Sequence, residues 1–374
     1  MNNTITIFFG KILNLINKNR SLASLIIVFF IIIGSDFLFH QFYPQVISTL
    51  EYFFDLGKDT HSAVDLTFAP EIWGGVLATV LGTLIIVIAI AAESTPKLMD
   101  LFVRDWVSLI FIWFLILASI HSTIIMYYFE PMERLSSVML NTYIYLPLSS
   151  MLSLPYIFYI LLYSKTDNVI KKLYSLNIDD IKRLKNKPIH LAMNDVKVIE
   201  HYQYQLMSTI DQFDDLLEYI SFKEAQTEII RSVGDTVKEY MRNKTSYDLR
   251  FFSATGTIRN NPTFRTYIEH QYKDIEDRKT FYEVKAFKMM GNAYIRKMEN
   301  GEYELASLIA NEISSVGILA LELEQDDLII DINIRFNTFM RFAIKHAVRN
   351  NEPRNLYNLA FHYSTLLQGY VDYN

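Results

Sequence analysis

The chain has 374 residues, no cysteine and a formal net charge of −6. The lack of cysteine excludes disulfides, thiolate zinc sites and a cysteine nucleophile. Charge is distributed unevenly, because residues 1–164 contain 18 charged side chains and residues 165–374 contain the other 58. This division predicts a membrane-embedded first part and a water-exposed second part.

Four stretches of the first part are long and apolar enough to cross a bilayer, which takes about 20 helical residues. Their interiors are almost free of charge, with Asp36 near one end of the first stretch and Glu93 at the end of the second. We therefore expect residues 1–164 to form a transmembrane domain of four helices. The predicted spans are residues 22–42, 73–92, 106–128 and 142–163.

Lysine and arginine in short flanking segments set the direction of membrane helices. The three flanks that would share one side of the membrane hold 12 positive charges, whereas the two opposite loops hold only Lys58 and Arg134. This bias predicts a protein of the bacterial inner membrane with both termini in the cytoplasm.

The second span has two different faces when its residues are placed about 100° apart around a helix. One stripe, roughly a quarter of the circumference, carries small and mildly polar residues, and the opposite face carries branched aliphatic ones. Small residues either let two helices pack closely or line a pore, so both interpretations predict self-association. The stripe consists of Gly75, Ala78, Thr79, Gly82, Ile86, Ala89 and Glu93.

The two interpretations assign different roles to the polar members of this stripe. In a pore, Thr79 would offer a hydroxyl group and Glu93 a ring of carboxylates at the cytoplasmic mouth. In a packed helix pair, Glu93 would lie at the membrane interface and could pair with Lys97 or Arg104.

The third and fourth spans contain polar or helix-distorting residues. His121 lies among hydroxyl-bearing residues, a pattern more typical of hydrogen-bonded packing than of a proton relay. Pro147 and Pro155 each free a backbone carbonyl group in the preceding turn, and nearby serines can satisfy such groups. The fourth span is therefore expected to be kinked.

A short amphipathic helix is predicted at the inner membrane surface between the second and third spans. Thr95 followed by Pro96 is a typical helix start, in which an N-cap residue precedes a proline at the first helical position. The candidate functional residues of this inner hairpin are Pro96, Lys97, Phe102, Arg104 and Asp105.

The same hairpin resembles a bacterial family of predicted membrane proteins that is catalogued as a domain of unknown function. The resemblance lies in Pro96-Lys97-Leu98 followed by Phe102-Val103-Arg104-Asp105, directly after a span rich in small residues, and covers about residues 70–130. A later cluster of Pro, Asn and Asp in the family is matched loosely by Asn260-Asn261-Pro262. The resemblance implies four spans before a soluble C-terminal region, and it carries no established activity.

The second part of the chain is predicted to be a basic linker over residues 165–194 and a cytoplasmic helical domain over 195–374. Residues 246–262 are expected to be an irregular connector and the best candidate for a mobile segment. The predicted helices cover residues 195–222, 224–243, 263–299, 302–324, 328–349 and 354–371.

Two helix pairs near the end of the chain are related in sequence. Tyr303 and Ala306 follow one Asn-Gly-Glu turn, and Tyr357 and Ala360 follow an Asn-Asn-Glu turn. This pattern is similar to that of tetratricopeptide-type hairpins, although its spacing contains an insertion. We therefore expect a bundle of stacked helical hairpins, an architecture that usually binds partner proteins or further copies of itself.

The second part contains no motif that indicates catalysis, a metal site or a cofactor. It lacks a phosphate-binding glycine loop, a His-Glu-x-x-His pair and a nucleophile elbow. Its net charge of −2, with mixed signs, gives no footprint for nucleic acid. Three adjacent acid pairs are typical of solvent-facing helices rather than of a calcium loop. They are Asp179-Asp180, Asp214-Asp215 and Asp326-Asp327.

Two functions are compatible with these patterns, and neither is enzymatic. The first is a homo-oligomeric ion channel of the inner membrane, with the second span lining the pore and the helical domain acting as a gate or sensor. The second is a membrane-anchored receptor or scaffold whose helical domain binds a cytoplasmic protein partner.

Overall fold

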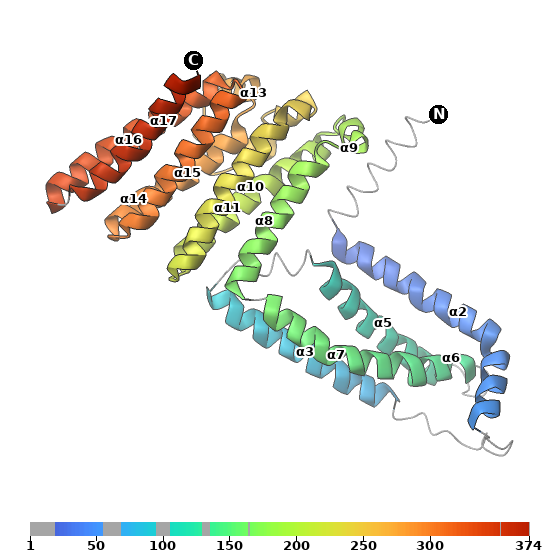
Figure 1. Ribbon diagram of the computed structural model, residues 1–374. Helices are drawn as coiled ribbons and strands as arrows, with labels where there is room; N and C mark the ends of the chain where they lie inside the picture. Colours follow the sequence, from blue (N-terminus) through green and yellow to red (C-terminus); the bar gives the residue numbers. More distant parts are fainter. Residues whose placement is uncertain are drawn as a thin grey trace. The chain divides into compact units, whose positions relative to one another are not determined.

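The computed structural model describes residues 19–54, 69–94, 105–128, 135–163, 165–351 and 353–373. Every regular element in these ranges is a helix, which agrees with the predicted all-α fold. The chain separates into two compact units, one over Ile16–Lys165 and one that contains Thr166–Asn374. We call them the apolar unit and the helical unit, and each is described by itself (Figure 1).

In the apolar unit, α3 packs against α5 and α7, and α2 packs against α5 and α6. Its helices are α2 (Arg20–Phe54), α3 (Ala69–Ser94), α5 (Trp106–Tyr128), α6 (Leu135–Met139), the π-helix η2 (Leu140–Tyr145) and α7 (Leu146–Tyr163).

Five helices within the described ranges are long and apolar enough to cross a membrane. In four of them only 17% to 33% of the most apolar stretch is buried in the protein, whereas the corresponding value for α15 (Tyr303–Glu322) is 61%. The four poorly buried helices expose apolar surface that lipid would cover, which indicates a membrane protein. The four stretches are Arg20–Gln45, Pro70–Val87, Trp106–Tyr127 and Leu135–Leu162.

The distortion expected in the fourth apolar stretch takes the form of a π-helical turn. The backbone N–H of Leu146 donates to the carbonyl oxygen of Asn141, five residues earlier, immediately before Pro147. Proline has no N–H to continue the α-helical pattern, and π-turns absorb such interruptions. Ser149 Oγ donates to the carbonyl oxygen of Leu146 at 2.8 Å, which is not the carbonyl group that Pro147 leaves free four residues earlier.

The helical unit is an array of two layers, in which consecutive long helices alternate between the layers and run antiparallel (Figure 1). One layer contains α8, α11, α15 and α17, and the other contains α10, α14 and α16, with each helix contacting its neighbours in its own layer and in the other. The bounds are α8 (Thr166–Arg183), α9 (Lys187–Ala192), α10 (Val196–Tyr219), α11 (Lys223–Asn243), η3 (Lys244–Ser246), η4 (Leu249–Phe252), α12 (Gly256–Arg259), α13 (Glu269–Asp277), α14 (Phe281–Glu299), α15 (Tyr303–Glu322), α16 (Asp326–Asn350) and α17 (Arg354–Tyr373).

The structure differs from the predicted linker over residues 165–194. This segment forms α8 and α9, and α8 packs against α10 and α11. The side chains of Val169, Ile170 and Leu173 are buried there, because they recur on one face of the helix. The basic residues that suggested a linker lie on the remaining, water-facing surface.

Residues 246–262, expected to be irregular and mobile, are packed instead. They form short helical turns whose side chains Phe251 and Ile258 are fully buried. The amide of Gln203 on α10 donates to the carbonyl oxygens of Phe251 at 2.7 Å and Ser253 at 2.8 Å. These bonds replace the regular backbone pairing that the segment lacks.

The single helix predicted over residues 263–299 is two helices, α13 and α14. The break follows Arg278, where Lys279 adopts a left-handed conformation with φ of 58°. Left-handed residues commonly end helices, and glycine or asparagine is the usual signal. A lysine in this position gives no such signal, so the helical periodicity of the sequence predicted one uninterrupted helix.

Candidate functional site

The two faces of α3 have opposite environments within the chain. Trp73, Val80 and Val87 recur every seven residues and are 0%, 1% and 7% exposed, because this face packs against α5 and α7. The small-residue stripe lies on the opposite side. Gly75, Ala78, Thr79, Ile86 and Ala89 are exposed and Gly82 is half-exposed.

No part of the described chain covers the glycines of this stripe. A Cβ atom placed on Gly75 or Gly82 would meet nothing within 4 Å. The hydroxyl group of Thr79 donates to the backbone carbonyl of Gly75 at 2.9 Å, so its hydrogen is bonded within the helix and its oxygen remains an acceptor. The branched face of α3 is therefore the internal one, and no described residue covers the two glycines of the small face.

Of the candidate residues in the inner hairpin, Asp105 is the one that lies within the described part of the chain. Pro96, Lys97, Phe102 and Arg104 lie outside the described residues, as does the side chain of Glu93. Asp105 is 3% exposed, and its carboxylate accepts hydrogen bonds from the backbone N–H and the hydroxyl group of Ser108, at 3.0 and 2.8 Å. It therefore caps the start of α5.

A polar cluster inside the apolar unit joins four helices around Asn141. The Asn141 carbonyl oxygen accepts a hydrogen bond from the indole N–H of Trp73 at 2.8 Å. Its amide nitrogen donates to the backbone carbonyl of Ala118 at 2.9 Å and to Nδ1 of His121 at 3.1 Å. Asn141 is 1% exposed, and every hydrogen of its amide has an acceptor.

This geometry determines the tautomer of the neutral His121 ring. Indole can only donate and a backbone carbonyl can only accept, so the orientation of the Asn141 amide is determined by Trp73 and Ala118. Its nitrogen then faces His121 Nδ1, which must act as the acceptor. In the neutral ring the hydrogen is therefore on Nε2, which lies 3.9 Å from the Asp36 carboxylate.

Two further contacts tie α2 to the same cluster. The hydroxyl groups of Ser35 and Tyr145 are hydrogen-bonded, and Tyr145 lies 6.2 Å from the His121 ring, centroid to centroid. His40 Nδ1 and Ser136 Oγ are 2.7 Å apart. His121 lies seven residues before the end of α5, about 10 Å along the helix axis, so the cluster is inside the apolar stretch rather than at its end.

The sequence placed Asp36 and His121 on different spans and did not predict that they meet. Trp73 and Asn141 carried no signal either, because each is an isolated residue in an apolar stretch. Ionisable residues inside apolar helices are functional candidates by default. Here the cluster places an imidazole 3.9 Å from a carboxylate, and its hydrogen bonds join α2, α3, α5 and η2.

Acidic residues of the helical unit are engaged by basic ones. Asp214 receives a 2.6 Å hydrogen bond from Arg296; burial raises the pKa of its carboxyl group, and the guanidinium acts against that change. Asp180 lies 3.6 Å from Arg183. Among the residues with described positions, no group of three or more His, Asp or Glu side chains could hold a metal ion.

Comparison with known proteins identified no relative of this chain. No family model matches the chain, and no curated protein or solved structure is similar to it. The resemblance of residues 70–130 to the uncharacterised membrane family therefore stays a prediction from sequence.

Proposed function

We propose that the apolar unit crosses the bacterial inner membrane four times, with both termini and the helical unit in the cytoplasm. The excess of basic residues in three of the flanks supports this direction. The low burial of four apolar helices supports the number of spans, since the fifth, α15, uses its apolar residues in the core of the helical unit.

We further propose a homo-oligomeric ion channel in which copies of α3 surround the pore. The orientation of α3 carries this proposal: its branched face is buried within the chain, and its small face is not. In a single chain surrounded by lipid, acyl chains would gain little contact from glycine and alanine. A neighbouring copy or a column of water explains the small face better.

In this arrangement Thr79 presents a hydroxyl oxygen to the pore, and Glu93, one position before the end of α3, provides acidic charge at the cytoplasmic mouth. A ring of carboxylates concentrates cations at an entrance, so the proposed channel prefers cations.

Reconstitution in planar bilayers tests the channel. Wild-type protein should conduct under voltage, tension or calcium, and Glu93→Lys should weaken or reverse the cation preference, whereas Glu93→Gln should have an intermediate effect. Wild-type protein that assembles in the bilayer without conducting under any of these stimuli would count against the channel.

Gly82→Leu tests the role of the small face in assembly. The new side chain has open space within the chain, so folding should be retained while cross-linking between copies is lost. Gly74→Leu is the matched control, because Gly74 also has nothing within 4 Å but lies outside the stripe, about 80° from Gly82 around the same helix. Equal loss of assembly in both variants would remove the small face from the interface.

The alternative, a receptor or scaffold, is favoured by one surface of the helical unit. The last two helices expose apolar side chains, which include Val348 at 81%, Phe361 at 58% and Val371 at 70%. Outer helices of repeat arrays usually present polar surfaces to water. If this surface binds a soluble protein, Phe361→Glu should abolish that complex and leave assembly through α3 unchanged.

A further inference from the structure

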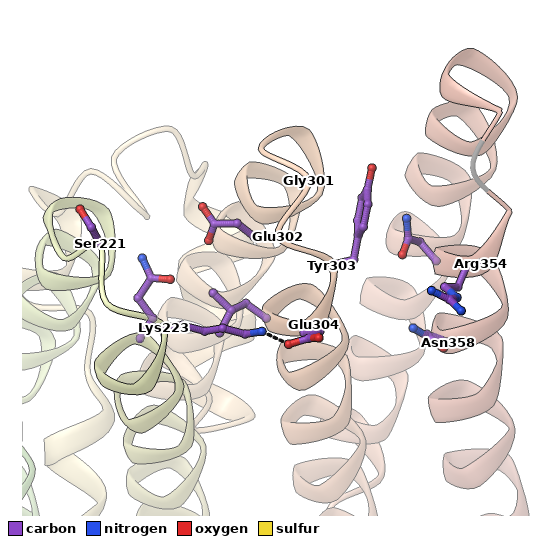
Figure 2. Close-up of a pocket in the computed structure, with 11 residues that line it drawn as sticks. Ser221, Lys223, Gly301, Glu302, Tyr303, Glu304, Arg354 and Asn358 are labelled. Atoms are coloured by element: carbon purple, nitrogen blue, oxygen red, sulfur yellow. Dashed lines mark ion pairs between the residues drawn. The ribbon is translucent and has the colours of Figure 1, made fainter.

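A pocket of about 540 Å³, lined mostly by polar and charged residues, lies at one edge of the helical unit. It is formed by the first turns of three neighbouring helices, α11, α15 and α17, and Figure 2 shows Lys223, Tyr303 and Arg354 around it. The last turns of α10, α14 and α16 end at the same edge but contribute no lining residue. The pocket is therefore surrounded by helix starts, whose partial charge is positive.

The first backbone N–H groups of α15 and α17 have no acceptor among the described residues. Neither α11 nor α15 has a side chain that caps its start. The first N–H groups of a helix have no acceptor within the helix, and anions commonly satisfy them. Among the described hydrogen bonds, none starts from the backbone nitrogen of Tyr303, Glu304, Arg354 or Asn355.

The charged side chains at the pocket leave one cation unbalanced. Lys223 is ion-paired with Glu304, as Figure 2 shows. Glu302 accepts a 2.6 Å hydrogen bond from Lys297. Arg354 has no acidic partner among the described ion pairs. A guanidinium group next to free N–H donors is well suited to bind a phosphate group.

Asn355 gives an independent indication that a ligand is missing. It lines the pocket, it is only 5% exposed, and neither Oδ1 nor Nδ2 has a hydrogen-bond partner within the described chain. A buried amide without a partner destabilises a fold unless something else satisfies it. A bound polar molecule at this position would remove that cost.

We propose that this pocket binds a phosphate-bearing anion through Arg354, Asn355 and the first N–H groups of α15 and α17. Two sources share this chemistry, a free phosphorylated molecule and the headgroup of an anionic lipid. The second is relevant because α8, which follows the last apolar helix after two residues, begins at the same edge of the array (Figure 1). The site does not depend on the channel, since it involves only helices of the helical unit.

Hydrogen–deuterium exchange of the full-length protein tests the proposal at the amides concerned. Inorganic phosphate is titrated into lipid-free protein in detergent, and phosphate-free protein is compared in nanodiscs of phosphatidylglycerol and of phosphatidylcholine. Protection of the segments that begin α15 and α17 by phosphate identifies a free anion as the ligand. Protection only in phosphatidylglycerol identifies the headgroup, and no protection in either arm overturns the proposal.

Arg354→Gln should shift the midpoint of protection by about tenfold or more, as expected for the loss of a charge-assisted hydrogen bond. Arg349→Gln is the matched control, because Arg349 is also exposed but does not line the pocket. Unchanged thermal unfolding of both variants would show that they fold. An equal shift in both variants would mean that phosphate is attracted by positive charge in general, and this result would overturn the proposed site.

Discussion

Trp73 and Asn141 form a 2.8 Å hydrogen bond between buried side chains that are separated by 68 residues of sequence. The bond links α3 to the π-turn before α7, and Asn141 extends it to His121 on α5. Because the surroundings are apolar, each of these polar groups depends on the others for its partners.

Replacing Asn141 by leucine should destabilise the apolar unit by about 1–3 kcal/mol, since the Trp73 N–H is left buried without an acceptor. Loss of the hydrogen bond in Trp73→Phe should lower the free energy of unfolding by less than Asn141→Leu does. The double variant should lower it by less than the sum of the two single changes. Unfolding in mixed detergent micelles measures these differences. Thr123→Val is the control, because Thr123 is exposed and its hydroxyl bonds only within its own helix; a comparable loss there would contradict the assignment.

Nitrogen NMR of the histidine rings should find the neutral His121 ring with its hydrogen on Nε2. The reason is that the Asn141 amide nitrogen faces Nδ1 and requires an acceptor there. In Asn141→Leu this preference should disappear. A hydrogen on Nδ1 in the wild-type protein would show that the Asn141 amide is oriented differently.

Glu283→Gln should destabilise the helical unit by about 3–5 kcal/mol, because it leaves the ammonium group of Lys244 buried without its counter-ion. The two side chains are 0% and 8% exposed and lie 2.9 Å apart. The combined change Lys244→Met and Glu283→Leu should recover most of this loss, since it removes both charges. Denaturant unfolding followed by circular dichroism measures both; equal losses would argue against an isolated buried pair.

Gly317→Leu should destabilise the helical unit by about 1–3 kcal/mol through overpacking. A Cβ atom on Gly317 would lie 2.6 Å from Leu366 on α17 and 3.4 Å from Ile332 on α16, where α15 crosses both helices closely. Asn311→Leu places the same side chain on the exposed side of α15 and should change stability by less than about 0.5 kcal/mol. Similar melting curves for the two variants would refute the close crossing.

Lowering the pH should weaken the contact between α15 and α17 through His362. Burial lowers the pKa of this imidazole from its ordinary value of 6.5, so the unfolded chain binds the proton more readily than the folded one. The free energy of unfolding should therefore fall as the pH decreases below about 6.5.

His362→Gln keeps a group that can bond to Ser307, which lies 2.9 Å from the histidine Nε2. This variant should lose less stability than the wild type between pH 7 and pH 5 in thermal unfolding. Identical pH dependence in the two proteins would exclude His362 as the cause of the stability loss at low pH.

The position of the apolar helices follows from local composition. A run of about 20 apolar residues specifies a helix of membrane-spanning length without information from the rest of the chain. Amphipathic periodicity likewise located α10, α11, α15, α16 and α17 within a few residues, because one face of each helix is buried. The same local reasoning passed over the break at Lys279, where no glycine or proline marks the turn.

The sequence by itself determined that this is an all-helical protein with an apolar part and a charged part, and that α3 has one small and one branched face. Only the tertiary structure decided that the branched face is internal, that α8 belongs to the array, and that Asp36, His121, Asn141 and Trp73 meet. The physical reason is the separation along the sequence of the residues that interact. Helix formation depends on neighbours within a few residues, whereas a hydrogen bond across 68 residues depends on how whole helices pack.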